Sequence, residues 1–516
     1  MTSRAAKRKT KNQPATQAIA GTREPVKPGK KARRRQRFRM LRLLVLAGLL
    51  VTLGLICFNL KFWVLDLDLW VHLRVGDWIV QHHAFPHSGL FSRTAADRPW
   101  IAYSWGYELL FSRAYAWFGV MGIGIFETLM TLAVAYSVYW MVRCLSGRFW
   151  LSCLLAAAAC SAFLIPAYAL RCCSMVLFII TLTLILEANR SGRVQLLYWL
   201  PLIFLVWSNL HIQFIYGVVV LGLFVAINLL QRLASSLGLA PGFLLPPTLP
   251  VLPLAAILAA CLVATCVGPY SFHLYEVVYT YSKAKAAYTL VSELQAPDFS
   301  QYRHYAELLL AAAAFVAVGW RKEVDLFKLA LLAVASAVAF RTVRDAWFVC
   351  IPAAACIADF PAPETSRDPA ETFPENLVVA ALVVVTLWLF APVADFTPSG
   401  LEQALSAQLP VNAVKFLQEH PRPGPLYNTF DWGSFLIWSM PNYPVAIDGR
   451  TDLYGDQIDE RFALTARGVS YKDDPYLNES RLVLLQKKNI LVKFLTTDPR
   501  FESIYQDGVA VVFVRR

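Results

Sequence analysis

"LRLLVLAGLLVTLGLICFNLKFW", residues 41–63, is followed directly by "VLDLDLWVH", residues 64–72. The first stretch is apolar over almost its whole length and is long enough to cross a bilayer as one helix. The second stretch sets Asp66, Asp68 and His72 immediately beside it. The chain has 516 residues, of which 57% are hydrophobic, and this composition predicts a polytopic membrane protein.

Further apolar windows of about 18 to 20 residues recur along the chain and predict about eleven transmembrane helices. The predicted spans lie at 41–63, 119–142, 149–168, 172–188, 196–210, 213–231, 250–268, 304–320, 325–341, 345–359 and 377–394. The expected fold class is therefore mainly α, a polytopic helical membrane protein.

The positive charge is confined to the N-terminal end. Residues 1–40 hold fourteen Lys or Arg and a single acid, Glu24, so they account for the whole net charge of +13. This composition predicts a disordered basic tail in the cytoplasm that contacts anionic lipids, and it gives no reason to expect a nucleic-acid partner. Four of the five connections on the same side as the tail are rich in Lys and Arg, as the orientation rule for cytoplasmic loops requires.

The last part of the chain reads as a separate unit. An odd number of spans places residues 395–516 outside the cytoplasm. Beyond residue 410, a helical pattern in "VNAVKFLQEH" is followed by the β-rich runs "GPLYNTF", "YPVAIDG", "ILVKFL" and "VAVVFVRR". We therefore predict three parts: the tail 1–40, a transmembrane domain 41–394 with an extracytoplasmic loop 64–118, and a small extracytoplasmic α/β domain 395–516.

Ionisable and polar residues near the predicted span ends fall on one side of the membrane. Such residues are costly at membrane depth, so a set that converges on one face predicts a site. The members are Asp66, Asp68, His72, Arg74, Arg171, Asn209, His211, Glu293, Arg341 and Arg344.

Each member also has a purely structural interpretation. Asp66 or Asp68 could cap the helix that follows. The arginines could extend along apolar surface to the interface, and Asn209 with His211 could form an ordinary turn in the aromatic belt. The set as a whole supports a site better than any single residue does.

Local spacing sharpens this hypothesis. If residues 69–83 form a helix, Asp68 and His72 are i,i+4 neighbours on one face, and Asp66 lies close to both. The arrangement places a carboxylate base next to a possible acid or metal ligand.

Five blocks of the sequence together resemble bacterial membrane proteins with the C-type (GT-C) fold of lipid-phosphosugar-dependent glycosyltransferases. The blocks are "DLDLWVHLRVGDWIVQHHAFPHSGLFSRTAADRPWIAYSWGYELLF", "WSNLHIQF", "GPYSFHLYEVV", "VSELQAPDF" and "GPLYNTFDWGSFLIWSMPNYPVAIDGRTDLYG". In that family, an essential acidic residue lies in the first extracytoplasmic loop near the end of the first span. The matching positions here are Asp66 and Asp68.

The resemblance implies a glycosyltransferase of the bacterial cytoplasmic membrane. Its donor would be a sugar on a polyprenyl phosphate, and its acceptor a glycan, a lipid or a protein. Asp66, Asp68 and His72 are the expected catalytic group. Arg171, Arg341 and Arg344 would clamp the phosphate.

The remaining candidates are expected to bind substrate: Arg74, Asn209, His211 and Glu293. His211 and Glu293 would position the acceptor or bind a metal, so a divalent metal is possible. Two other functions stay open at this point: a transporter or flippase of a lipid-linked or anionic solute, in which the same charges would line a pathway, and a non-catalytic membrane assembly protein.

Overall fold

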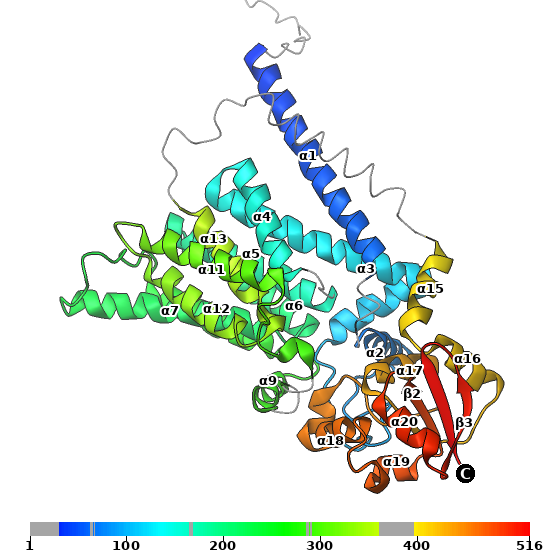
Figure 1. The fold of residues 1–516 in the computed structure, drawn as a ribbon. Helices are drawn as coiled ribbons and strands as arrows, with labels where there is room; N and C mark the ends of the chain where they lie inside the picture. The colour runs from blue at the N-terminus through cyan, green and yellow to red at the C-terminus, as the bar shows by residue number, and fades with distance from the viewer. Residues whose placement is uncertain are drawn as a thin grey trace, which may run out of the picture.

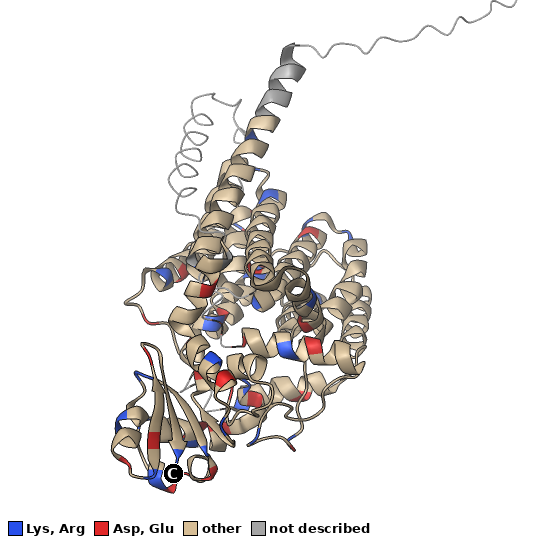
Figure 2. Cartoon of the chain, turned by 90° about the vertical axis from the view of Figure 1, so that its right-hand side faces the viewer, with Lys and Arg blue, Asp and Glu red and all other residues tan. Residues whose placement is uncertain are grey.

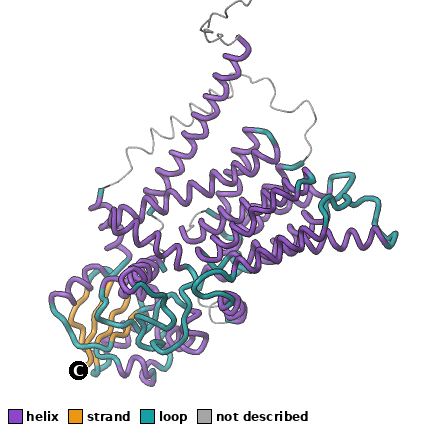
Figure 3. The backbone as a smooth tube through the Cα atoms, turned by 180° about the vertical axis from the view of Figure 1, so that it is seen from behind, coloured by secondary structure: helices purple, strands orange, loops and turns teal. Residues whose placement is uncertain are grey.

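The computed structural model of the chain describes residues 30–61, 66, 68–164, 169–284, 288, 291–360 and 397–516. Most of these residues are helical, and all the strands lie near the C-terminus (Figures 1 and 3). The helices before residue 361 are α1 (Lys30–Leu60), α2 (Leu69–His82), α3 (Trp105–Ser146), α4 (Phe149–Phe163), α5 (Ala169–Ser191), α6 (Leu200–Leu210), α7 (Phe214–Ser236), α8 (Val251–Thr265), α9 (His273–Lys283), α11 (Tyr302–Gly319), α12 (Leu326–Ala339) and α13 (Trp347–Ala358).

Every predicted span that falls within the described residues coincides with one of these helices. Within the described residues, four helices are long and apolar enough to cross a membrane: α1 through its segment Met40–Asn59, α3, α5 and α7. Several others are apolar but shorter. The predicted span 377–394 lies outside the described residues, so the count of eleven stays a prediction.

The boundary of the basic tail was predicted wrongly. We expected a disordered tail up to residue 40, but α1 begins at Lys30 and continues without a break to Leu60. Lys and Arg are good helix formers, so the apolar helix extends backward through the basic segment. Residues 1–29 lie outside the described part of the chain.

The body of the molecule is built around α3, against which α2, α4 and α5 pack. α3 is bent at Gly119, whose φ of 59° is accessible mainly to glycine. α1 rests on α3 at its C-terminal end and slants away from the body, so that its N-terminal end lies farthest from the C-terminal domain (Figure 1).

The C-terminal part is a small α/β domain, as predicted. Its elements are α15 (Pro398–Gln408), α16 (Val411–Glu419), β1 (Leu426–Asn428), α17 (Gly433–Ser439), α18 (Thr451–Ala466), α19 (Pro475–Glu479), β2 (Leu482–Gln486), α20 (Ile490–Thr497), β3 (Phe501–Gln506) and β4 (Ala510–Arg515). The sheet has the order β1-β2-β4-β3, in which β1 and β2 are parallel and the other two pairs antiparallel.

Two of the predicted β-rich runs are not strands. "ILVKFL" forms α20, because Asn489 caps it by accepting a hydrogen bond from the Leu491 amide at 2.9 Å, and Leu491 and Leu495 bury one helical face. "YPVAIDG" is an irregular segment, and its Val445 pairs with Ser92 of the loop between α2 and α3. The C-terminal domain therefore extends into this loop.

Candidate functional site

The site begins at the N-terminus of α2, where Asp68 immediately precedes the first helical residue. Asp68 does not cap the helix with its side chain, so the structural interpretation of this residue as a cap is wrong. Instead, the Asp68 amide donates a hydrogen bond to Oδ1 of Asp66 at 3.0 Å. This turn holds the two carboxylates beside each other, as the sequence predicted.

His72 lies one helical turn after Asp68, and its amide donates to the Asp68 carbonyl at 3.1 Å. Its ring Nδ1 lies 2.9 Å from Oε1 of Glu108, a buried residue in the first turn of α3. The predicted helix 69–83 is thus confirmed, because α2 spans Leu69–His82. Glu108 anchors the imidazole toward the two aspartates.

Basic residues from two other elements face the carboxylates. Arg171, near the start of α5, forms an ion pair with Glu293 at 2.5 Å. Arg344 lies between α12 and α13, and its charge acts on both Asp68 and Glu293. Figure 2 shows acidic and basic segments close together where the helical body meets the C-terminal domain. The structure therefore brings the predicted acids and two of the predicted arginines into one cluster.

The C-terminal domain forms one wall of this cluster. A Cβ atom placed on Gly449 would lie 2.0 Å from Oδ1 of Asp68, so only glycine allows this approach. Ser434 of α17 accepts a hydrogen bond from the Val71 amide at 2.8 Å, which satisfies one free amide in the first turn of α2. Trp70 packs edge-on against Phe435 with ring centroids 5.3 Å apart.

A second contact from the same domain reaches the other side of the site. Asp452 accepts a hydrogen bond from the Tyr281 hydroxyl at 3.2 Å, and Tyr281 lies 3.2 Å from the hydroxyl of Tyr103. Arg344 also acts on both tyrosines. Residues from the loop after α2, from α9 and from α18 thus join the polar cluster around Asp68.

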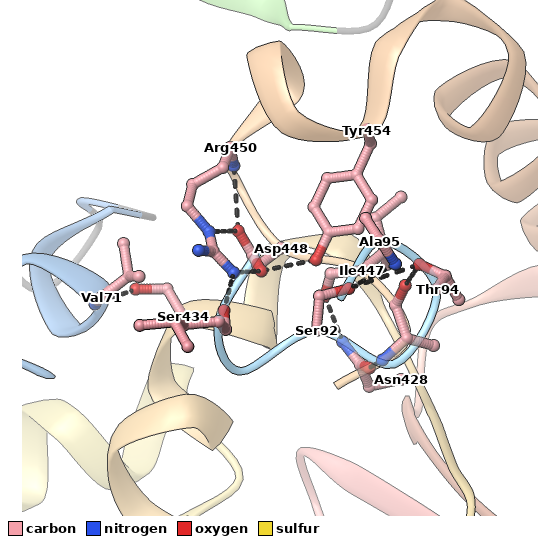
Figure 4. A network of polar contacts seen from close by, with 12 residues as sticks. Val71, Ser92, Thr94, Ala95, Asn428, Ser434, Ile447, Asp448, Arg450 and Tyr454 are labelled. Carbon is pink, nitrogen blue, oxygen red and sulfur yellow. Dashed lines mark hydrogen bonds and ion pairs between the residues drawn. The ribbon is translucent and has the colours of Figure 1, made fainter. Parts of the chain in front are cut away.

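The segment that carries Gly449 is held by a closed polar network (Figure 4). Both oxygens of Asp448 accept hydrogen bonds from the Arg450 guanidinium at 2.8 Å, and Oδ2 also accepts from Tyr454 at 2.6 Å. Arg450 in turn donates to the Leu90 carbonyl at 3.0 Å and lies over the ring of Trp100. This pair is structural, and it fixes Gly449 against Asp68.

The protonation equilibria of the acids follow from burial and from neighbouring charges. Burial, and then the charge of Asp68, raise the pKa of Asp66 to about 7. Burial also raises the pKa of Asp68, although the charges of His72 and Arg344 oppose the change. Burial lowers the pKa of His72, but the hydrogen bond to Glu108 and the nearby carboxylates outweigh this and raise it overall.

In the C-terminal domain, the pKa values of Asp448 and Asp452 shift in opposite directions. Burial alone would raise the pKa of Asp448, but the Arg450 guanidinium holds it below its ordinary value. Burial raises the pKa of Asp452 to about 6, since Arg450 opposes the change only in part. Asp66, Asp68 and Asp452 are thus easier to protonate than Asp448, which lies in the closed network.

Asn209 and Arg74 were also predicted to bind substrate, and their side chains contact other groups. The Asn209 side-chain oxygen accepts from Trp105 at 3.0 Å, and its amide donates to the Leu205 and Val267 carbonyls. These bonds use both amide donors and one of the two acceptor positions of the side chain. The guanidinium of Arg74 lies 5.7 Å from the centre of the Phe91 ring.

His211 and Arg341 lie at the edge of the cluster. Nδ1 of His211 lies 2.7 Å from the Ser174 hydroxyl in a buried position, while its charge environment includes both Arg171 and Arg344. Arg341 is exposed, and its guanidinium lies 4.9 Å from the centre of the Tyr288 ring. Of the three arginines predicted to bind phosphate, Arg171 and Arg344 are the two whose charges act on the aspartates.

The sequence analysis missed several groups that contact the cluster: Tyr103, Glu108, Glu127, Tyr281 and Asp452. Glu108 and Glu127 could have been found, because both are acidic residues within a long apolar helix. Asp452 could not, since nothing in the local sequence indicates that it meets α9. Within the described ranges, no group of three or more His, Cys, Asp or Glu side chains is arranged to hold a metal ion.

No protein-family model matches the chain, and no curated protein matches it. Among solved structures, the chain is similar to ArnT from Cupriavidus metallidurans, whose crystal structure was determined bound to undecaprenyl phosphate. The match covers 90% of this chain and 97% of that chain, with 12% sequence identity and a TM-score of 0.44. At this level the likeness decides neither donor nor acceptor, and the chemistry must be judged from the side chains.

Proposed function

We propose that the chain is a membrane glycosyltransferase that moves a sugar from a polyprenyl-phosphate-type lipid to an extracytoplasmic acceptor. The observation that carries the proposal is the adjacent, half-buried pair of Asp66 and Asp68, on which the charges of Arg171 and Arg344 act. Sugar transfer from a lipid phosphate needs a base for the acceptor hydroxyl and positive charge for the departing phosphate. The cluster offers a carboxylate base and two guanidinium groups close together.

Asp66 acts as the base in this proposal. The acceptor hydroxyl gives its proton to the Asp66 carboxylate as its oxygen forms a bond to the anomeric carbon. The bond from that carbon to the phosphate oxygen breaks, and the lipid phosphate leaves with the electron pair. A base with a pKa of about 7 suits this step, because it is partly ionised at neutral pH and still accepts a proton readily.

Asp68 and His72 position this base. The Asp68 amide holds Oδ1 of Asp66, and the charge of Asp68 keeps the Asp66 pKa high. His72, anchored on Glu108, supplies a raised-pKa imidazole close to both aspartates. The sequence hypothesis assigned all three to catalysis, and the geometry favours one base with two positioning residues.

Arg344 and Arg171 bind the phosphate in this proposal. The Arg344 side chain forms no hydrogen bond with another residue in the described part of the chain. Burial lowers its pKa, but the charge of Glu293 and of other nearby acidic groups outweighs this and raises it overall. A guanidinium with free donors can hold a phosphate through two parallel hydrogen bonds. Arg171 is already paired with Glu293. As the donor enters, Arg171 would leave Glu293 and bind the phosphate instead.

The proposed setting is the bacterial cytoplasmic membrane, with the N-terminus in the cytoplasm and the C-terminal domain on the other side. The basic N-terminal segment would contact anionic lipids. The acceptor, a glycan, lipid or protein, would enter from the side of the C-terminal domain.

The proposal is tested by mass spectrometry of polyprenyl-linked sugars and surface glycans in a deletion strain. We expect one lipid-linked sugar to accumulate and one surface sugar to disappear. The wild-type gene should restore both, whereas Asp66→Asn, produced at the same level, should restore neither. Unchanged lipid-linked sugars in the deletion strain would contradict transfer. Full restoration by Asp66→Asn would instead favour a transporter or an assembly protein.

A further inference from the structure

A cavity lies within the C-terminal domain, away from the cluster around Asp68. It has a volume of about 230 Å³ and opens where the parallel strands β1 and β2 end, at Asn428 and Gln486. The carboxyl ends of parallel strands are a common place for ligands in α/β domains. The opposite wall is one face of α18, formed by residues at helical spacing: Asp459, Phe462, Ala463 and Ala466.

Two side chains in this cavity have unused hydrogen-bonding capacity. Oδ1 of Asp459 and the hydroxyl of Thr429 are buried, and neither has a hydrogen-bond partner among the described residues. The two residues are 4% and 8% exposed. Buried polar groups are costly to leave unpaired, so a ligand that pairs with both would gain affinity from them.

The lining restricts the chemistry of this ligand. It contains no Lys, Arg or His, and it carries two acids, Asp459 and the exposed Asp431. No cation is therefore available to hold a phosphate or carboxylate, and Asp431 would repel one. The other polar groups are neutral hydroxyls and amides, and they alternate with the apolar side chains of Phe430, Phe462 and Leu485.

One apolar wall is rigid. Phe462 stacks on Tyr427 with ring centroids 5.1 Å apart and on Tyr476 at 5.5 Å, so three aromatic rings form a fixed column. A ring with a flat apolar face and hydroxyl groups around its edge would fit between this column and the polar groups of β1. A monosaccharide has this shape and chemistry.

We propose that this cavity binds one sugar residue of a glycan, with hydroxyl groups paired to Asp459 and Thr429. The protonation state of Asp459 agrees with a neutral ligand. Burial, and then the charges of nearby aspartates, raise its pKa to about 8, so the carboxyl is mostly neutral at pH 7 and does not attract a cation. A protonated carboxyl can both donate to and accept from sugar hydroxyls.

This site goes beyond the proposed transfer reaction and does not depend on it. Ile447 and Thr451, which line the cavity, flank the segment that carries Gly449 to Asp68. The two sites therefore share one segment of chain but use different side chains. A variant of one site can be examined for its effect on the other.

The test uses the full chain in lipid nanodiscs free of alkyl-glycoside detergent. Saturation-transfer NMR is recorded with D-glucose, D-galactose and N-acetylglucosamine as probes, and with putrescine and inorganic phosphate for comparison. Ala463→Leu fills the cavity, and Ala407→Leu makes the same change at an exposed position of α15. Thr429→Val removes the unpaired hydroxyl with almost no change in shape.

We expect at least one sugar to bind to the wild type, to Ala407→Leu and to Asp68→Asn. Binding should be lost in Ala463→Leu and weakened at least about fivefold in Thr429→Val. If Ala463→Leu does not fold, Thr429→Val decides the outcome. The proposal is overturned if no probe sugar binds to the wild type, if putrescine or phosphate alone binds, or if Thr429→Val binds as the wild type does. Loss of binding in Asp68→Asn would also overturn it, because the sugar would then occupy the site of the transfer reaction.

Discussion

Asp68 and Asp448 lie on either side of Gly449, yet their surroundings differ completely. Both oxygens of Asp448 are held by Arg450, and Tyr454 adds a further hydrogen bond. Oδ1 of Asp68 is buried and has no hydrogen-bond partner within the described residues. The pKa of Asp448 is lowered, whereas the pKa of Asp68 is raised.

The difference separates an acid that is fully used in structural contacts from one that stays available beside the proposed base, Asp66. A buried carboxylate whose lone pairs are all used gives a rigid segment and has no capacity left for a substrate. A buried carboxylate with an unused oxygen and a raised pKa can take up a proton. In this molecule the Asp448–Arg450 pair supports the Asp66–Asp68 pair through Gly449. The following predictions test this division between a structural pair and the proposed site.

The largest effect is expected from Asp66→Asn, which keeps the size of the side chain but removes its basicity. Transfer of sugar by the purified protein should fall by about two to four orders of magnitude. Asp77→Asn is the matched control, because Asp77 lies in α2, close to Asp66 in the sequence, but accepts from Ser112 and Arg113 outside the cluster. Equal losses in both variants would mean that Asp66 has no special role.

Arg450→Leu should act by reducing the stability of the fold, because Arg450 takes no part in the proposed transfer step. It leaves Asp448 buried without its partner, which costs about 3–5 kcal/mol in comparable buried pairs. The thermal unfolding midpoint should drop clearly. Arg516→Leu breaks an exposed pair with Glu502 and should change stability by less than about 1 kcal/mol. If the two variants unfold at the same temperature, Asp448–Arg450 is not the support of the site.

A smaller effect is expected when the phosphate clamp is weakened. Arg344→Gln should raise the KM for the lipid donor about tenfold to a hundredfold, since hydrogen bonds to charged groups contribute about 1.5–3 kcal/mol. Arg341→Gln should stay within about twofold, because the exposed Arg341 lies over Tyr288. Steady-state kinetics with varied donor would measure both. A larger change in Arg341→Gln would restore the sequence hypothesis in which Arg341 belongs to the clamp.

The sequence predicted those parts of the fold that depend on local pattern. Apolar windows located the helices, and the helix hypothesised over residues 69–83, which makes Asp68 and His72 i,i+4 neighbours, is α2. The charges near the span ends predicted that Asp66, Arg171, Glu293 and Arg344 would meet. These inferences use periodicity and hydropathy, which a single sequence contains.

The rest of the site depends on contacts between distant segments. Gly449 meets Asp68 across almost the whole chain, and Tyr281 meets Asp452 from another helix. No periodicity encodes such pairs. The contacts of Asn209 are a similar case, because the sequence shows that a polar residue is present but not that its side chain bonds to Trp105 and to two carbonyl groups.

The pH dependence of sugar transfer tests the central assignment most directly. If Asp66 is the base, kcat/KM for the wild type should fall below pH about 7, because the carboxyl is then protonated and cannot accept the acceptor's proton. In Asp68→Asn the remaining activity should fall only at a lower pH, because the negative charge that helps raise the Asp66 pKa is gone. A profile that is flat from pH 5 to 8, or one that Asp68→Asn leaves in place, would contradict the account.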